Sequence, residues 1–145
     1  MKKIIIMLAV AISSLTAFAS DKNVNSTVLN AFNKEFAGAK DVQWTSTSDY
    51  YKAAFVYNGQ NVNAFYKVDG EFIAMTRNIT SLELPINLQT NLKNNYSKYW
   101  ITDLFEVSSN EGTSYYITME KADAKLILKS DGSGKWDVFR KMTKI

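Results

Sequence analysis

The sequence contains no cysteine and no histidine, and it has a single proline among 145 residues. Without cysteine the chain cannot form a disulfide, so its fold must depend on a hydrophobic core. The two absences together exclude Ser/His/Asp and Cys/His nucleophiles, histidine acid–base catalysis and zinc sites of ordinary composition. A glycine-rich phosphate-binding loop is also missing. We therefore expect no catalytic residue, no metal and no cofactor, and we interpret the protein as one that is not an enzyme.

Without histidine and cysteine, the carboxylates are the groups that remain for acid–base catalysis or metal binding. The segments Asp69-Gly70-Glu71 and Asp131-Gly132-Ser133-Gly134 look like fragments of calcium loops. Both lack the run of oxygen ligands that such a loop needs, whereas aspartate before glycine is typical of a hairpin turn. A carboxylate-based glycan hydrolase would need two acids at a defined spacing in one cleft, and no pair is evidently so placed. Both segments are interpreted as turns.

The first 19 residues have the features of an export signal. Two lysines at positions 2 and 3 precede a mostly apolar stretch that ends near Leu15, and Ala17-Phe18-Ala19 is a small-x-small cleavage site. The apolar stretch is too short to be read as a membrane span. We expect cleavage after Ala19, a mature chain of residues 20–145, a periplasmic or secreted location and no membrane span.

The charge of the mature chain is nearly balanced, because two of the 17 basic residues belong to the signal and 14 residues are acidic. The high isoelectric point therefore does not indicate nucleic-acid binding. The distribution is uneven: residues 20–120 contain 8 basic and 11 acidic groups, and residues 121–145 contain 7 and 3. The basic end is either a solvated face or an edge that meets an acidic partner.

The first half of the mature chain predicts one helix and four strands. Residues 26–37 have apolar side chains at helical spacing and Gly38 after them, and residues 41–45 read as a short strand. Residues 50–77 predict three antiparallel strands joined by the turns Asn58-Gly59 and Asp69-Gly70, which favour type I′ geometry. These turns pair Tyr57 with Gln60, Phe55 with Val62, Ala53 with Ala64, Tyr51 with Tyr66, Val68 with Glu71, Tyr66 with Ile73 and Ala64 with Met75.

This register assigns the side chains to two faces. The core face carries Tyr51, Ala53, Phe55, Tyr57, Val62, Ala64, Tyr66, Val68, Ile73 and Met75. The other face is mixed and carries Tyr50, Lys52, Ala54, Val56, Asn61, Asn63, Phe65, Lys67, Phe72 and Ala74. An antiparallel sheet with one solvated face has this pattern.

The second half again predicts one helix and four strands. Pro85 suits the first turn of a helix that continues through Leu88 and Leu92, and strands follow at residues 101–108, 115–121, 124–129 and 135–141. A two-residue turn at 122–123 pairs Met119 with Leu126 and Ile117 with Leu128. The side of the sheet taken by Trp136 depends on the length of the preceding glycine-rich turn and stays open.

The halves therefore predict an α+β fold, a tandem repeat of a helix plus a four-stranded antiparallel sheet. The repeats would span about 24–77 and 84–141 within a single domain of residues 20–145. Both helices would pack on one face of the sheets and leave an open sheet surface on the other.

The order of these features resembles a known family. The chain resembles the PepSY-like proteins of Bacteroidetes-type bacteria. The features that it shares with them are a signal peptide, Asp41-Val42-x-Trp44, Tyr50-Tyr51-x-Ala53-x-Phe55, the two turns and Leu84-Pro85 opening a second helix. That family resembles the beta-lactamase-inhibitor-protein fold. The resemblance implies that the open sheet surface binds and regulates secreted enzymes, and it transfers no catalytic residue to this chain.

We therefore expect an exported, non-enzymatic binding module, an inhibitor or regulator of an extracytoplasmic enzyme. Aromatic anchors with lysines at their rim are typical of protein interfaces. The predicted partner-binding residues are Tyr50, Phe65, Phe72, Tyr116, Ile127, Lys125 and Lys129. The alternative is a structural envelope protein that associates with copies of itself through its sheet faces or edges.

Overall fold

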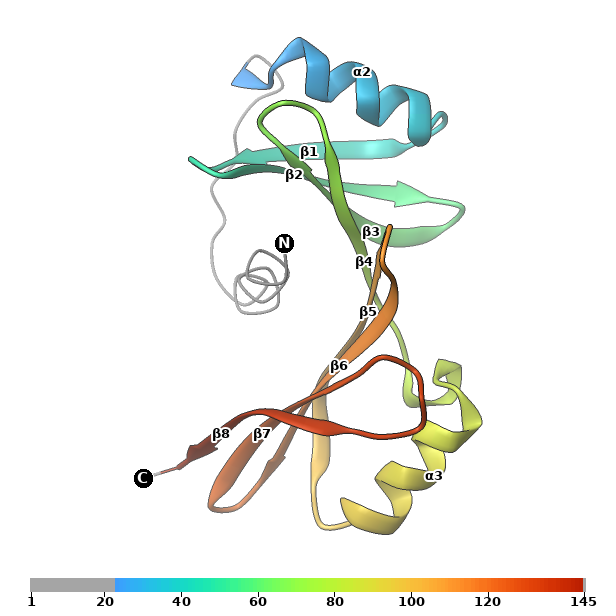
Figure 1. Cartoon of the computed structure of the whole chain (residues 1–145), viewed down its shortest axis with the longest axis vertical. Coiled ribbons are helices and arrows are strands. Elements are labelled where there is room, and N and C mark those ends of the chain that lie inside the picture. The colour runs from blue at the N-terminus through green and yellow to red at the C-terminus, as the bar shows by residue number, and fades with distance from the viewer. Residues whose placement is uncertain (1–22, 145) are drawn as a thin grey trace. The chain divides into compact units, whose positions relative to one another are not determined.

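The computed structural model describes residues 23–144, so the predicted signal peptide and its cleavage site lie outside it. The chain divides into two compact units, one ending at Arg77 and one beginning at Asn78. In chain order the elements are α2 (Ser26–Glu35), β1 (Lys40–Ser46), β2 (Tyr50–Tyr57), β3 (Gln60–Lys67), β4 (Phe72–Asn78), the 3-10 helix η2 (Ser81–Glu83), α3 (Ile86–Asn95), β5 (Trp100–Ser109), β6 (Gly112–Lys121), β7 (Ala124–Ser130) and β8 (Asp137–Thr143) (Figure 1). Among the described residues, no helix is long and apolar enough to cross a membrane.

The strands form one eight-stranded antiparallel sheet in the order β1-β2-β3-β4-β5-β6-β7-β8. The predicted α+β tandem repeat, with a separate four-stranded sheet in each half, is therefore wrong. The reason is that β4 and β5 are neighbours in the sheet. Ile79, directly after β4, donates its N–H to the Leu104 carbonyl of β5 at 3.1 Å. The segment with η2 and α3 is thus a connection between two neighbouring strands of one sheet, and it does not begin a second sheet.

In the first unit, α2 packs on one face of the strands. Asn25 caps the helix, because its Oδ1 accepts a hydrogen bond from the Thr27 N–H at 2.7 Å. The helix ends at Glu35, two residues before the predicted end. Its buried side chains join a core that contains Val24, Val28, Phe32, Phe36, Trp44, Ala53, Phe55, Val62, Ala64 and Tyr66. The face predicted to be the core is therefore the face under the helix, except that Val68, which was assigned to it, is 47% exposed.

The first hairpin has the predicted register. Asn58 and Gly59 both have positive φ, 50° and 78°, as a type I′ turn requires. Phe55 lies opposite Val62, and Tyr51 lies opposite Tyr66. The prediction of this turn and of its strand pairing is confirmed.

The second hairpin differs from the prediction by one residue. Asp69 does not have a positive φ and Gly70 does, at 93°, and the Lys67 N–H bonds to the Glu71 carbonyl at 2.8 Å. The loop therefore has three residues, with glycine in the left-handed position, instead of two. Phe72 consequently pairs with Tyr66 in place of Ile73.

A β-bulge next to this pair restores the predicted register, so that Ala64 still faces Met75. The placement of Phe72 on the exposed sheet face is wrong, because its ring packs against the helix-side core and lies 5.6 Å from the Tyr66 ring.

In the second unit, α3 packs on the strands in the same manner. Pro85 is the residue just before the first helical residue, and Leu88 and Leu92 are buried. Met119 pairs with Leu126 and Ile117 with Leu128, which confirms the predicted register. The core contains Ile79, Leu84, Leu88, Leu92, Leu104, Ile117, Met119, Leu126, Leu128 and Trp136.

Trp136, whose side was left open, lies on the helix side of the sheet. It is 8% exposed, and its indole N–H donates to the Leu88 carbonyl of α3 at 3.2 Å. This hydrogen bond connects the glycine-rich turn before β8 to the first turn of α3. The hydrogen bond satisfies the polar atom of a ring that is otherwise surrounded by apolar side chains.

The first and last strands of the sheet each contain a register break. In β1 the partners shift between Lys40 and Gln43, around Asp41, whose φ is 53°. In β8 the shift occurs where the partner residues change from Ile127 to Leu128. A bulge of this kind bends a strand and increases its local twist.

A candidate protein-binding surface on the second unit

The sheet of each unit has a second face, opposite its helix. In the second unit we call this the distal face, and it carries Trp100, Phe105, Tyr116, Glu120, Lys125, Ile127, Lys129, Phe139 and Lys144. The register supports this grouping, since Tyr116 pairs with both Phe105 and Lys129, and Glu120 pairs with both Trp100 and Lys125. In the described part of this unit α3 is the only α-helix, and it packs on the other face.

Tyr116 lies at the centre of the distal face. Its ring stacks on Phe105, with centroids 5.3 Å apart and planes at 8°, and meets Phe139 edge-on at 5.8 Å. The Lys129 ammonium sits over the Tyr116 ring, 5.5 Å from its centroid, at the distance of a cation–π contact. The aromatic rings therefore form one packed row that holds a lysine in position.

Burial distinguishes Tyr116 and Phe105 from the residues at the rim of the row. Tyr116 is 0% exposed, and its hydroxyl has no hydrogen-bond partner among the described residues. Ile127, Lys125 and Lys129 are half-buried. A ligand approaching this face would meet the lysine side chains and Ile127 before it met the tyrosine ring.

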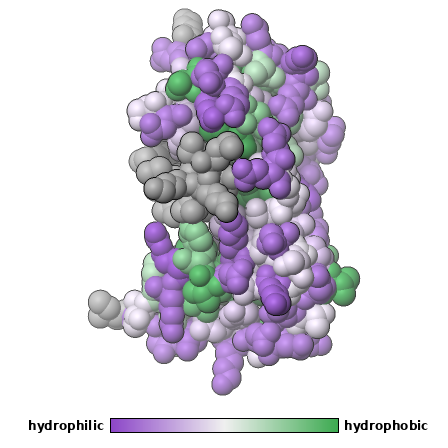
Figure 2. Space-filling model, viewed as in Figure 1, coloured by the Kyte–Doolittle hydropathy of each residue, from purple (hydrophilic) through white to green (hydrophobic). Residues whose placement is uncertain are grey.

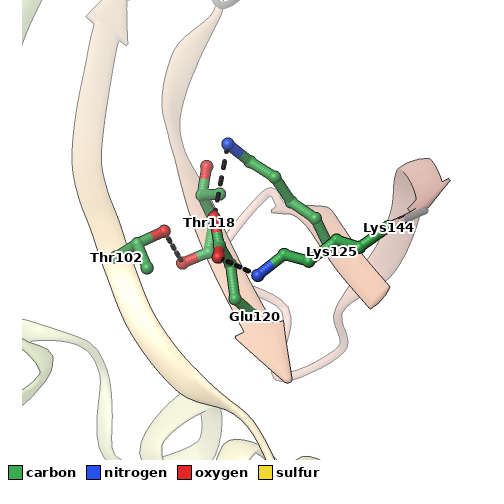
Figure 3. A network of polar contacts seen from close by, with 5 residues as sticks. All are labelled: Thr102, Thr118, Glu120, Lys125 and Lys144. Carbon is green, nitrogen blue, oxygen red and sulfur yellow. Dashed lines mark hydrogen bonds and ion pairs between the residues drawn. The ribbon is translucent and has the colours of Figure 1, made fainter. Parts of the chain in front are cut away.

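A polar network extends the row at the end of β6 (Figure 3). Glu120 accepts a hydrogen bond from Lys144 and forms an ion pair with Lys125 at 3.5 Å. The Lys144 ammonium also lies 5.4 Å from the centroid of the Trp100 ring. Beside them, the Thr102 hydroxyl donates to the Thr118 carbonyl at 3.4 Å. The Glu120 carboxylate thus orients two lysines. The three side chains together carry a net positive charge at the end of β6.

The hydrogen bond from Lys144 lowers the pKa of the Glu120 carboxyl below its ordinary value, and Lys125 lowers it further, although partial desolvation opposes them. Because the folded-state pKa is the lower one, the ionised network stabilises the fold above the ordinary carboxyl pKa. This contribution disappears as the pH falls through the lowered value.

We predict that Lys144→Gln moves the pKa of Glu120 back toward its ordinary value, because it removes the main hydrogen bond to the ionised carboxylate. A carbon-detected NMR titration of the side-chain carboxyl measures this. Lys121→Gln is the matched control, since Lys121 pairs with Asp123 instead. An unchanged Glu120 pKa in the Lys144 variant would show that the network does not form in solution.

The predicted residues of the first unit lie in different places. Tyr50 is half-buried and meets Phe65 edge-on at 5.7 Å, opposite the helix as expected. Phe65 itself is 1% exposed, and Phe72 is on the helix side. Lys52, on the same face as Phe65, has its pKa lowered by burial. In this unit the face opposite the helix therefore offers fewer accessible side chains than the prediction assumed.

A shallow concavity of about 360 Å³ lies on this face of the first unit. Amide side chains from Gln43, Asn61 and Asn63 line it together with Ala54 and Val56. Among the described residues, no group of three His, Cys, Asp or Glu side chains is arranged to hold a metal ion.

Five residues of the distal face were missed as site residues, namely Trp100, Phe105, Glu120, Phe139 and Lys144. The turn at Asn110-Glu111 would have placed Phe105 opposite Tyr116 had its register been counted, because Ser109 pairs with Gly112. The same count would have put Trp100 on the wrong face, because a bulge between Ile101 and Asp103 shifts the register by one residue. Phe139 is the unpaired residue at the register break of β8, so alternation alone does not locate it. Lys144 lies beyond the end of β8 and carries no periodic signal.

Neither a family model nor a curated protein matches this chain. Several solved structures of Bacteroides proteins are similar to it, among them structures of proteins from Bacteroides ovatus, Bacteroides eggerthii and Bacteroides fragilis. A DUF2874 family protein from Bacteroides ovatus is 18% identical, with a TM-score of 0.74, over 83% of this chain and 88% of that one. A protein from Bacteroides eggerthii, described provisionally as periplasmic, is 21% identical, with a TM-score of 0.72, over 83% and 88%.

The third is a BLIP-like protein from Bacteroides fragilis, 15% identical with a TM-score of 0.71, over 91% of this chain and 89% of that one. At these identities the similarity concerns the fold alone. The chain has the fold of the BLIP-like and DUF2874 proteins of Bacteroides.

Proposed function

We propose that the protein is an exported, non-enzymatic binding module that holds a negatively charged protein partner on the distal face of its second unit. The observation that supports this most strongly is the ordered set of lysines. Lys129 is held on the Tyr116 ring, and Lys125 and Lys144 are held by Glu120. Side chains that are ordered before binding lose less entropy when a partner arrives.

Export and regulation are parts of the same proposal. The signal at residues 1–19, cleaved after Ala19, would deliver the chain to the periplasm or the cell exterior, in line with the description of its Bacteroides eggerthii neighbour. The PepSY-like sequence features and the BLIP-like neighbour support a role as an inhibitor or regulator of an extracytoplasmic enzyme. Inhibition of a beta-lactamase in particular is not proposed.

The experiment uses charge reversal at the rim. The parent protein and a Lys125→Glu/Lys129→Glu variant would each capture proteins from a periplasmic extract, and the captured partner would then be purified and its affinity measured by calorimetry. We expect the variant to bind at least tenfold more weakly, because two attractive charges become repulsive. Charge reversal at exposed Lys34 and Lys40 of the first unit is the matched control.

Equal affinity of the parent and the distal-face variant, with both folded, would reject the distal face as the binding surface. Substitution of Phe65 or Phe72 is not a useful test of binding. Both rings pack against neighbouring side chains, so their loss would be expected to change stability first.

A further inference from the structure

The 3-10 helix η2 and the first residue of α3 together expose two large aliphatic side chains. Leu82 is 82% exposed and Ile86 is 74% exposed, more than any other large hydrophobic residue in the described chain. In Figure 2 the described surface is largely polar, and a hydrophobic protrusion stands at the right edge, level with the loop before α3 in Figure 1. We call Leu82 and Ile86 the knob.

The knob is held in place by its own backbone and neighbours. The Thr80 N–H and hydroxyl donate to the Glu83 carboxylate at 2.7 and 3.1 Å, which closes a capping box. The Gln89 side chain donates to the carbonyls of Leu82 and Leu84 at 3.2 and 2.8 Å. These hydrogen bonds hold the loop in one conformation in the structure, and an ordered loop loses less entropy when it binds.

A shallow groove lies beside the knob. It has a volume of about 280 Å³, and most of its lining is apolar, from Leu92, Tyr96, Tyr99 and Ile101. Ser81 and Gln89 also line it. Ser81 precedes Leu82 in the chain, and Gln89 lies three residues after Ile86 on α3, so knob and groove are adjacent parts of one surface. A surface that carries both a projection and a matching recess can be complementary to itself.

We propose that this surface binds a second copy of the chain, with the knob of each copy seated in the groove of the other about a two-fold axis. The charges are complementary, since Glu83 lies in the knob loop and Lys93 lines the groove. A lipid surface fits less well, because Glu83 is the only charged residue between positions 78 and 92 and membrane-binding segments are rich in lysine and arginine. This association uses the helix side of the second unit and leaves the distal face available.

Sedimentation velocity on protein purified from the periplasmic fraction tests the association. We expect a reversible dimer within about 1 μM to 1 mM, the range of a small transient interface. The Leu82→Ser/Ile86→Ser variant should raise the dissociation constant at least tenfold. Val68→Ser, at a residue that is 47% exposed in the first unit, should leave it unchanged.

A parent that stays monomeric throughout this range would overturn the proposal. A dimer that forms equally well without the knob would also overturn it. Lys125→Glu/Lys129→Glu on the distal face should dimerise as the parent does, so this result is independent of whether the proposed function holds.

Crosslinking tests which parts meet. Because the chain has no cysteine, Leu82→Cys and Ser97→Cys variants would each carry one thiol, at the knob and in the groove lining. With a short bis-maleimide, the mixture of the two variants should crosslink faster than Leu82→Cys alone and faster than Val68→Cys mixed with Ser97→Cys. If Leu82→Cys crosslinks to itself as fast as to Ser97→Cys, knob meets knob and the proposed arrangement is wrong.

Discussion

Replacing Phe32 with alanine should lower the free energy of unfolding by about 3–5 kcal/mol, the usual cost of removing a buried phenylalanine ring. Phe32 is 3% exposed and lies at the centre of the first core. Its ring centroid is 5.0 Å from that of Phe55 and 5.1 Å from that of Trp44, both edge-on, with Phe36 and Tyr66 next to it. The substitution removes these ring contacts together and leaves a cavity between α2 and the strands.

Urea denaturation followed by tryptophan fluorescence measures this effect. At a slope of about 2 kcal/mol/M the midpoint should fall by roughly 2 M. Val68→Ala is the matched control, because Val68 is an exposed aliphatic residue of the same unit, and it should change stability by less than about 0.5 kcal/mol. A midpoint for Phe32→Ala equal to that of the parent would mean that α2 does not pack on this face.

Replacing Trp136 with alanine should cost a similar amount, about 3–5 kcal/mol. The indole fills the second core and connects it to α3 through the hydrogen bond to Leu88. Trp136→Phe separates the two contributions, because it keeps most of the apolar contact and loses the hydrogen bond, which is worth about 1 kcal/mol.

Thermal and urea unfolding of both Trp136 variants would test this, with Val138→Ala, at a residue 59% exposed on β8, as the control. If Trp136→Ala and Val138→Ala destabilised the protein equally, the indole could not occupy the core. The result would also show whether the glycine-rich turn before β8 depends on α3 for its position.

Turn chemistry explains how far the sequence predicted the fold. Asn58-Gly59 allows one tight geometry, and the register that follows from it was predicted residue by residue. Asp69-Gly70 allows two geometries, because aspartate also suits the position before glycine in a three-residue loop. The choice between them moved Phe72 from one face of the sheet to the other, and no local signal in the sequence distinguishes the two.

The continuity of the sheet depends on contacts that are distant in the sequence. Apolar periodicity located α3 and the strands on either side of it, but it contains no information about whether β4 and β5 pair. Long-range strand pairing is decided by tertiary packing. The prediction therefore located the strands and α-helices, but it divided the eight strands between two sheets where the structure has one.

The candidate site was predicted in part for similar reasons. Alternation placed Tyr116, Lys125, Ile127 and Lys129 on one face, as the structure has them. It could not show that Tyr116 is buried by Phe105 and Phe139, since that depends on β5 and on the irregular β8. The result is a surface in which half-buried lysines surround a buried tyrosine ring, and Trp100, 52% exposed, is an accessible aromatic group.

The register breaks in β1 and β8 bear on aggregation. The first and last strands of a sheet have unpaired backbone groups that can template the addition of further chains, and natural proteins protect such edges with bulges and charged side chains. Lys40 and Asp41 stand at the break in β1, and Arg140 and Lys141 lie on β8. A chain without disulfides to fix its edges can in this way keep both ends of its sheet from growing into fibrils.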